Sequence, residues 1–407
     1  MPDSEIILIS ISGDDKPGVT RAITSILGDY DATILDIGQA DIHHTLSLGI
    51  LVKIPNRETS GNALKEILFK CSELDVKVKF KPVTEERYMQ WVNRQGAGRY
   101  IVTILGKQIT ARQLSMVTTA INEEGLNIDS IKRLTGRLPL DLNDDDSIRS
   151  CIELSVRGDM INKKKFAEKF MHYAGEFNID ISFQKDDIYR RNRRLICFDM
   201  DSTLIKTEVI DELAERAGVG EKVRAITESA MRGEIDFTES FKQRVSLLKG
   251  LDAGVLEDIA VHLPIMNGAK RLMTILKKCG YKIAILSGGF TYFGNYLKKL
   301  FDVDYVYANE LEIENGKLTG NFVGDVVDGK RKAELLRLIA QVEKIELEQV
   351  IAVGDGANDL PMLNLAGLGI AFHAKPTVKE NASQSISTIG LDGILYFLGF
   401  RDIHIDN

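Results

Sequence analysis

Cysteine and proline are scarce in this 407-residue chain, and long apolar runs are missing from it. The 4 cysteines show no CxxC spacing, which argues against disulfide bonds and structural zinc. No run reaches the roughly 18 apolar residues of a membrane span, and the chain does not open on a basic segment followed by an apolar stretch, as an export signal would. We therefore expect a cytoplasmic protein without membrane contact, whose thiols are reduced and buried. The cysteines are Cys71, Cys151, Cys197 and Cys279.

A surplus of basic charge is missing as well. The 52 Lys and Arg residues stand against 59 Asp and Glu residues, a net charge of −7. This balance argues against a nucleic-acid partner and against an acidic membrane surface, so the expected partner is a small molecule or a protein. A local basic cluster, Arg190-Arg191-Asn192-Arg193-Arg194, lacks interleaved aromatic residues, and we expect a solvated linker there.

The first half of the chain contains a repeated pattern. The length predicts two to four domains at roughly 100–200 residues each. The order strand, helix, strand, strand, helix, strand occurs once before and once after Gly98, which indicates an internal duplication. The strands are expected at 5–13, 32–41, 46–54, 76–83, 100–105, 126–133, 151–156 and 179–183, and the helices at about 19–27, 61–71, 111–123 and 163–176.

The turn after the first strand of each copy is a candidate binding element. In the first copy it reads Asp14-Asp15-Lys16-Pro17-Gly18-Val19, where glycine lets the backbone approach a ligand and the helix start offers unpaired N–H groups. The second copy has Gly106-Lys107-Gln108-Ile109-Thr110 at this place and continues later with Leu126-Asn127-Ile128-Asp129. The alternative is that Pro17 and Gly18 merely begin a helix.

Each copy resembles the ACT domain, a ferredoxin-like α+β module that binds an amino acid in many metabolic enzymes and often dimerises. The resemblance implies ACT domains at 1–86 and 98–185, a homodimer formed through them, and an amino-acid effector such as L-serine. Each copy carries only part of the family's pattern, so a site shared between copies or subunits is an open alternative. The matching positions for effector contacts are Asp15, Gly18, Gly106 and Asn127.

The second half contains three short apolar strands that each end in polar residues. Leu195-Ile196-Cys197-Phe198 runs into Asp199-Met200-Asp201-Ser202-Thr203. Two later strands end in Ser287-Gly288-Gly289 and in Gly354-Asp355-Gly356-Ala357-Asn358-Asp359. Fully apolar strands are typical of a parallel sheet, whose carboxyl edge is where α/β enzymes build their sites. Aspartates gathered at that edge repel one another, so a cation is expected.

These motifs resemble the haloacid dehalogenase-like phosphatases, whose fingerprint is DxDxT/V. The resemblance implies an α/β domain at 190–407 with a Rossmann-like parallel sheet. It implies that Asp199 attacks phosphorus and forms an aspartyl phosphate, while Asp201 protonates the leaving oxygen and then activates water. It also implies a Mg²⁺ cofactor held by Asp199, the main-chain carbonyl of Asp201 and Asp355, with Asp359 orienting these ligands.

The same resemblance implies a set of phosphate contacts. The hydroxyl of Ser287 and the N–H of Gly288 would hold phosphoryl oxygens, and Asn358 could touch the same group. Lysine at the start of a helix can neutralise the charge that develops in phosphoryl transfer, and the family's K-x-x-x-L pattern selects Lys332 for this role. Lys330 and Arg331 are neighbouring alternatives.

About 80 residues separate the first and second motifs, too many for a simple crossover. Helical patterns within 205–267 predict an inserted cap over the site. Its residues resemble those of phosphoserine phosphatases, in which Glu208 would pair with the substrate ammonium and Arg244 with its carboxylate. Met231 and Phe237 would wall the pocket. Ordinary surface charges are the alternative for Glu208 and Arg244.

These resemblances together imply a Mg²⁺-dependent phosphatase that converts O-phospho-L-serine to L-serine and phosphate, the last step of serine biosynthesis, under amino-acid control. A phosphatase or phosphotransferase for another small ester or a phosphoprotein is the first alternative. An amino-acid sensor with an idle phosphatase domain is the second.

Overall fold

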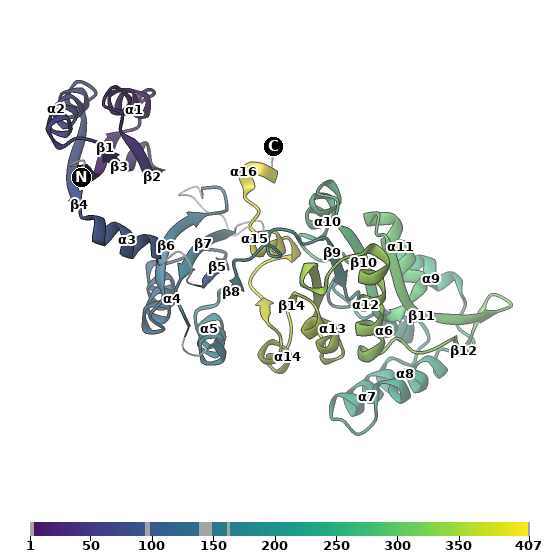
Figure 1. The fold of residues 1–407 in the computed structure, drawn as a ribbon. Coiled ribbons are helices and arrows are strands. Elements are labelled where there is room, and N and C mark those ends of the chain that lie inside the picture. The colour runs from purple at the N-terminus through teal and green to yellow at the C-terminus, as the bar shows by residue number, and fades with distance from the viewer. Residues whose placement is uncertain (1–3, 94–97, 138–148, 161–162, 406–407) are drawn as a thin grey trace. The chain divides into compact units, whose positions relative to one another are not determined.

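The computed structural model describes residues 4–93, 98–137, 149–160 and 163–405 (Figure 1). The chain divides into two compact units, residues 1–97 and 98–407. Among the described helices, none combines the length and the apolar character that crossing a bilayer requires.

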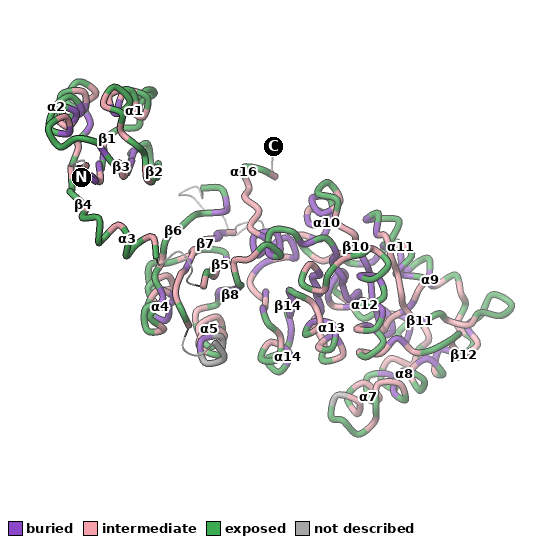
Figure 2. Tube along the Cα trace, viewed as in Figure 1, coloured by how far each residue is buried: buried purple, intermediate pink, exposed green. Residues whose placement is uncertain are grey.

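The first unit is a four-stranded antiparallel sheet in the order β2-β3-β1-β4. Side chains alternate along β1, so Ile7 and Ile9 are buried while Ser10 is exposed. The buried face packs on the two helices through Ile23 and Ile67, whereas β2 is exposed along most of its length (Figure 2). The elements are β1 (Glu5–Asp14), α1 (Val19–Asp29), β2 (Thr33–Ile42), β3 (Thr45–Ile54), α2 (Arg57–Glu73), β4 (Val76–Val83) and α3 (Glu85–Asn93).

The second unit begins with a sheet of the same topology, in the order β6-β7-β5-β8, as the duplicated pattern predicts. Its first helix starts differently from that of the first copy. Thr110 and Gln113 form a capping box, in which each side chain bonds the main-chain N–H of the other residue. The elements are β5 (Arg99–Gly106), α4 (Ala111–Glu123), β6 (Asn127–Arg133), β7 (Ser150–Arg157), α5 (Lys163–Phe177) and β8 (Asp180–Lys185).

A seven-stranded sheet in the order β12-β11-β10-β9-β13-β14-β15 follows in the same unit (Figure 1). Alternate residues of β9 face opposite layers: Ile196 and Phe198 share a core with α10 and α11, while Leu195 and Cys197 pack with α12 and α13. Burial on both faces explains the uninterrupted apolar run, and the predicted α/β class is confirmed.

The strands of this sheet are β9 (Leu195–Phe198), β10 (Lys282–Phe290), β11 (Tyr305–Glu314), β12 (Lys317–Val323), β13 (Val350–Gly354), β14 (Leu368–Phe372) and β15 (Gln384–Ile386). The helices that follow the strands are α10 (Ala269–Lys278), α11 (Thr291–Phe301), α12 (Gly329–Glu343), α13 (Leu360–Leu365), α14 (Pro376–Asn381), α15 (Ile394–Phe397) and α16 (Asp402–Ile405). All pairs are parallel except β11 with β12, a hairpin that the sequence patterns do not predict.

Helices between β9 and α10 form the predicted insertion. Buried residues such as Val209 and Leu213, four apart on α6, join the core that contains Phe198. Phe241 of α8 packs edge-on against Phe322 of β12, with ring centroids 5.2 Å apart. The helices are α6 (Val209–Arg216), α7 (Gly220–Met231), α8 (Phe237–Ser246) and α9 (Gly254–Val261), all within the range predicted for the cap.

Within the second unit, the edge strands β8 and β15 lie side by side. The main chain of Phe183 is bonded twice by the Gln384 amide: its N–H donates to Oε1 at 3.0 Å and its carbonyl accepts from Nε2 at 2.8 Å. Asp180 is 1% exposed and accepts from the N–H groups of Ser387 and Thr388. Burial raises the pKa of Asp180, although these hydrogen bonds oppose the shift. Each sheet thus covers an open edge of the other.

The basic cluster at 190–194 is only in part the solvated linker that we expected: two of its four arginines are exposed, and the other two are buried. Arg190 is 4% exposed and Arg193 is 8% exposed. Arg190 Nη2 donates to Glu153 of β7 at 2.6 Å, and Arg193 Nη1 donates to the main-chain carbonyl of Glu348 at 3.0 Å. Burial lowers the pKa of Arg193 to about 10. These arginines join the second ACT-like sheet to the seven-stranded one.

The cysteines follow the expectation in part. All four are free thiols, and Cys71, Cys151 and Cys197 are buried. Burial raises the pKa of each buried thiol, which keeps it protonated and unreactive. Cys279 is exposed, contrary to the expectation, because it caps the C-terminus of α10 beyond the last buried residue of that helix, Leu276.

Candidate active site

The polar residues that end β9, β10 and β13 meet at one edge of the seven-stranded sheet, because these strands are parallel neighbours. The N–H of Asp199 donates to the carbonyl of Val353 in β13 at 2.8 Å, which fixes the chain just beyond β9. A Cβ on Gly354 would lie 2.4 Å from Cγ of Asp359. Glycine at this position therefore lets Asp359 lie against the end of β13.

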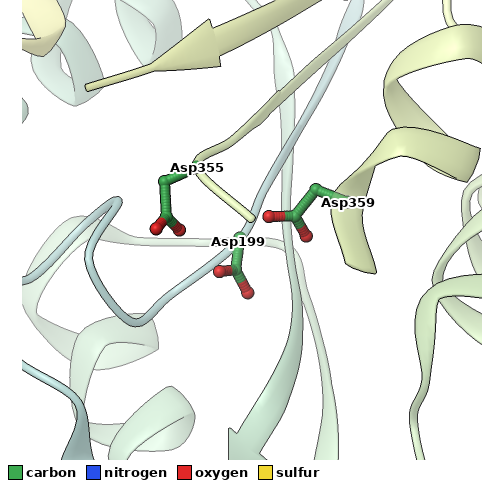
Figure 3. A group of neighbouring side chains, drawn as sticks. All are labelled: Asp199, Asp355 and Asp359. Carbon is green, nitrogen blue, oxygen red and sulfur yellow. The ribbon is translucent and has the colours of Figure 1, made fainter. Parts of the chain in front are cut away.

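Three carboxylates converge at this edge. Oxygens of Asp199, Asp355 and Asp359 lie within 4.8 Å of one another, and Figure 3 shows the three side chains as close neighbours. Burial and then the charge of Asp359 raise the pKa of Asp199 well above its ordinary range, and the same causes raise the pKa of Asp355 to about 7. A cation is needed for such groups to be ionised together, and carboxylate oxygens are the ligands that Mg²⁺ prefers.

Lys332 already supplies one positive charge to this cluster. Its ammonium donates to Asp199 Oδ1 and to Asp359 Oδ1, both at 2.7 Å, and the side chain is 0% exposed. Burial lowers the pKa of Lys332, but the charges and hydrogen bonds of the two aspartates outweigh it, so the net pKa is raised. Asp359 Oδ2 accepts from the N–H of Gly356 at 3.0 Å. Both oxygens of Asp359 are thus engaged by protein donors.

Asp201 contacts the start of the first cap helix, α6. It is 7% exposed, and its Oδ1 accepts from the N–H of Val209 at 3.0 Å. Burial and then the charge of Glu208 raise the pKa of Asp201 well above its ordinary range. A raised pKa means that the carboxyl group holds its proton more tightly, which suits a general acid that protonates a leaving group.

The end of β10 brings two glycines, Gly288 and Gly289, to the cavity, and Ser287 is buried behind them. Ser287 is buried, and its Oγ accepts from the N–H of Gly289 at 2.9 Å, which leaves the hydroxyl hydrogen to donate elsewhere. A Cβ on Gly289 would lie 2.4 Å from Asp201 Oδ2, so the loop and Asp201 are in close contact. Gly288 and Asn358 line the cavity in front of them.

A cavity of about 960 Å³ joins the strand ends to the cap. Glu208 lines this cavity, and its carboxylate accepts a hydrogen bond from Ser202 Oγ at 2.8 Å. The surrounding cap residues raise the pKa of Glu208 by desolvation. Arg244 is half-buried in the wall, with Nε donating to the carbonyl of Ser240 at 3.3 Å. Burial lowers the pKa of Arg244, and the charge of Glu208 opposes this shift.

Phe237 also lines the cavity, stacked beside Phe241 with ring centroids 6.4 Å apart. The side chain of Met231 lies outside the described part of the chain. Among the wall residues that the sequence patterns did not indicate are Lys375, Thr377 and Val378. These three follow β14, so extending the rule of polar strand ends to this strand would have pointed to Lys375 and Thr377.

The predicted effector residues lie at or beside the ends of helices and strands in the two ACT-like sheets. Gly18 has a φ of 98° and precedes α1, a left-handed conformation that glycine adopts without strain. The N–H of Asp15 donates to the carbonyl of His44. In the second copy, Gly106 ends β5 and is buried, whereas Asn127 begins β6 and donates to Asp129 Oδ1 at 2.8 Å.

Fold and site together define the chain as a haloacid dehalogenase-like hydrolase joined to two ACT domains. The family model of the haloacid dehalogenase-like hydrolases matches residues 193–367, and two ACT-domain models match residues 5–81 and 99–184.

The chain belongs to the phosphoserine phosphatase family. It is 36% identical over 398 residues to a phosphoserine phosphatase of Streptomyces coelicolor, covering 98% of this chain and 93% of that protein. It is 38% identical over 402 residues to phosphoserine phosphatase SerB2 of Mycobacterium tuberculosis, covering 98% and 94%.

Two solved structures of related proteins have a similar fold. A HAD-family hydrolase of Salmonella enterica serovar Typhi superimposes with a TM-score of 0.64 at 30% identity, over 74% of this chain and 98% of the other. A probable phosphoserine phosphatase of Vibrio cholerae, in unliganded form, superimposes with a TM-score of 0.57 at 33% identity, over 77% and 94%.

Proposed function

We propose that the protein hydrolyses O-phospho-L-serine to L-serine and phosphate with Mg²⁺. One observation carries this proposal: the cavity that contains Asp199 and Asp201 is also lined by Glu208 and Arg244. A carboxylate and a guanidinium beside a phosphoryl site suit a zwitterion, because the ammonium and carboxylate of serine need one partner of each sign. The place of this reaction in metabolism would be the last step of serine synthesis.

In the proposed mechanism, Asp199 attacks phosphorus while Asp201 gives its proton to the departing seryl oxygen. Asp201 then takes a proton from water, which attacks the aspartyl phosphate and releases Asp199. Asp199, the main-chain carbonyl of Asp201 and Asp355 would hold Mg²⁺, and Asp359 would orient them. When bound, Mg²⁺ supplies the positive charge that keeps buried carboxylates ionised and offsets phosphoryl charge.

The phosphoryl oxygens would be held by groups already described around the cavity. Gly288 and Asn358 line the cavity and offer a main-chain N–H and an amide. Lys332 and Ser287 are buried behind the lining, where the ammonium bonds Asp199 and the hydroxyl keeps a hydrogen to donate. These donors act on the charge that develops during transfer, which is where electrostatic catalysis is largest. Met231 and Phe237 would complete the apolar wall around the serine moiety.

A charge-matched set of substrates tests the proposal. Phosphate release is measured from O-phospho-L-serine, from O-phosphoethanolamine, which lacks the carboxylate, and from phosphoglycolate, which lacks the ammonium. Losing one charged contact is expected to lower kcat/KM by about 10- to 100-fold. Equal kcat/KM values for all three, or preference for a sugar phosphate, would contradict the proposed substrate. Binding of L-serine without any turnover would favour an idle sensor.

We further propose that amino-acid binding is coupled to the site through the second ACT domain. Helix α14 lies against α5 of that domain and places Thr377 and Val378 in the cavity wall. Strand β15 follows α14, and its Gln384 bonds the main chain of Phe183 in β8. A movement of β8 would therefore be transmitted to the cavity wall through the short segment that contains α14 and β15. The coupling expected of such a link is about 1–3 kcal/mol, measured as the change in KM with L-serine.

The remaining assignments are proposals of the same kind. The modules would span residues 1–86, 98–185 and 190–407, with the cap at about 205–267, and the free cysteines support a cytoplasmic setting. The ACT domains would form a homodimer, since edge strand β2 exposes Ile37 by 48% and Ile42 by 75%. Effector contacts would come from Asp15, Gly18, Gly106 and Asn127. Sedimentation of Ile42→Lys tests the dimer, and calorimetry with L-serine tests the effector.

A further inference from the structure

Strand β10 leaves the regular ladder just where it reaches the cavity. Leu286 is paired with Tyr307 of β11, and the next pair is Phe290 with Asn309. Four residue steps on β10 therefore face two steps on β11, and Ser287, Gly288 and Gly289 bulge out of the sheet. Bulges re-aim the chain beside active sites, at the cost of ladder hydrogen bonds that another group must replace.

The side chain of Asn309 replaces them. It is 1% exposed, and its Nδ2 donates to the carbonyl of Gly288 at 2.8 Å and to that of Gly289 at 3.3 Å. Its Oδ1 accepts from the N–H of Val327 at 2.9 Å. Two carbonyl partners and one N–H partner assign the two ends of the amide without ambiguity, and all three bonds are internal to the protein.

Both backbone segments that Asn309 bonds lead to groups of the site. The bulge carries Ser287 and approaches Asp201 so closely that a Cβ on Gly289 would lie 2.4 Å from the Asp201 carboxylate. Val327 is followed by Asp328, which caps α12 by accepting from the N–H of Arg331 at 2.8 Å. The same helix carries Lys332. One amide therefore ties the serine loop to the helix start that aims the lysine.

We propose that Asn309 is a positioning residue for phosphoryl transfer: it sets the Ser287–Gly289 loop and the start of α12 relative to each other. The proposal rests on the proposed function, since it assumes that these two segments meet the phosphoryl group. Asn309 does not line the cavity and acts only through the backbone that it holds. Misplacing a transfer group by about 1 Å costs on the order of 100-fold in rate.

The test compares the Asn309→Asp variant with the unsubstituted full-length protein and with a control variant, Gln184→Glu. Asn309→Asp keeps an oxygen that accepts from the N–H of Val327. It replaces the donating NH2 group by a second oxygen, which repels the carbonyls of Gly288 and Gly289. Gln184 is a matched control, because it is also buried, its Nε2 donates to the carbonyl of Phe397 at 2.8 Å, and it lies outside the cavity wall. Asn309→Ser, which keeps one hydroxyl donor, serves where the aspartate variant does not fold.

Orthovanadate, a transition-state analogue of the phosphoryl group, and L-serine are the two probes, each titrated by calorimetry with Mg²⁺. Asn309→Asp is expected to lower kcat and to weaken vanadate binding by about 10- to 100-fold, while L-serine binding changes less than about twofold. Gln184→Glu changes neither by more than about twofold. An unchanged kcat, or equal weakening of both probes, overturns the positioning role.

The two proposals fail in distinguishable ways. If the full-length protein does not hydrolyse O-phospho-L-serine, the proposed substrate is wrong, and turnover is then compared with para-nitrophenyl phosphate. Vanadate binding does not depend on the identity of the leaving group. A vanadate affinity that Asn309→Asp leaves intact therefore overturns the positioning role whatever the substrate is.

Discussion

Replacing Lys332 by methionine should show how much its ammonium contributes to the free energy of unfolding, since it lies between two buried carboxylates of the active site. The ammonium is fully buried and lies 2.7 Å from oxygens of both Asp199 and Asp359. Removing one partner of a buried ion pair typically costs about 3–5 kcal/mol, because the other charge is left uncompensated. Since Lys332 serves two carboxylates, we expect Lys332→Met to lose free energy of unfolding toward the top of that range when EDTA removes divalent cations.

The pH dependence of this loss has a defined sign. Lys332 opposes the rise in the pKa of Asp199, so its removal raises that pKa further above the ordinary 3.8. A carboxyl group whose pKa is raised by folding binds its proton more tightly in the folded state, and its contribution to stability falls as pH rises through the window above 3.8. The deficit of Lys332→Met should therefore be larger at about pH 8 than at about pH 5.

Urea unfolding followed by circular dichroism measures this deficit, with Lys330→Met as the control. Lys330 is exposed and lies two residues earlier on the same helix, so its removal should change the free energy of unfolding by less than about 0.5 kcal/mol. Saturating Mg²⁺ should shrink the Lys332→Met deficit by replacing part of the lost positive charge. Equal unfolding midpoints for the two variants, or a deficit insensitive to both pH and Mg²⁺, would refute the reasoning.

Three further predictions concern the metal, the substrate and the domain contact. Mg²⁺ at about 100 times its Kd should stabilise the wild type by about 2.7 kcal/mol and Asp355→Asn far less, as thermal unfolding will report. Arg244→Gln should lower kcat/KM for O-phospho-L-serine by about 10- to 100-fold but leave that for O-phosphoethanolamine nearly unchanged, and parallel losses would exclude a carboxylate contact. Asp180→Ala leaves three donors of Ser387 and Thr388 without their acceptor, so it should destabilise the second unit by about 1–3 kcal/mol and speed hydrogen exchange in β15; unchanged exchange would contradict the contact.

Local rules of sequence were sufficient for most elements, whereas the cavity residues that were predicted came from the resemblance of their motifs to known phosphatases. The alternation along β1 reflects the two-residue period of a strand, and the apolar run before Asp199 reflects burial of β9 on both faces. Both patterns can be read from residues that are close in the chain. The resemblance of their motifs to the phosphatases grouped Asp199, Ser287 and Asp355, and the strand order β10-β9-β13 shows that the ends of these strands are neighbours. The rule of polar strand ends, applied to β14, would have added Lys375 and Thr377.

Other features had no local signal. Arg190 and Arg193 look like solvated charges in the sequence, and only the contact between the second ACT domain and the seven-stranded sheet provides their partners. Cys279 looks like the other cysteines, but the end of α10 turns it outward. Asn309 is one polar residue within a strand, and its role depends on a bulge in a different strand.

The sequence by itself determined the duplicated ACT pattern, the parallel α/β core and which side chains end its strands, because periodicity and burial act between residues close in the chain. Tertiary structure alone decided that Lys332 lies between Asp199 and Asp359, that Asn309 holds the Ser287 loop, and that α14 connects the cavity to the second ACT domain. Those arrangements depend on distances between segments far apart in the chain, which only the packed sheet and its helices set.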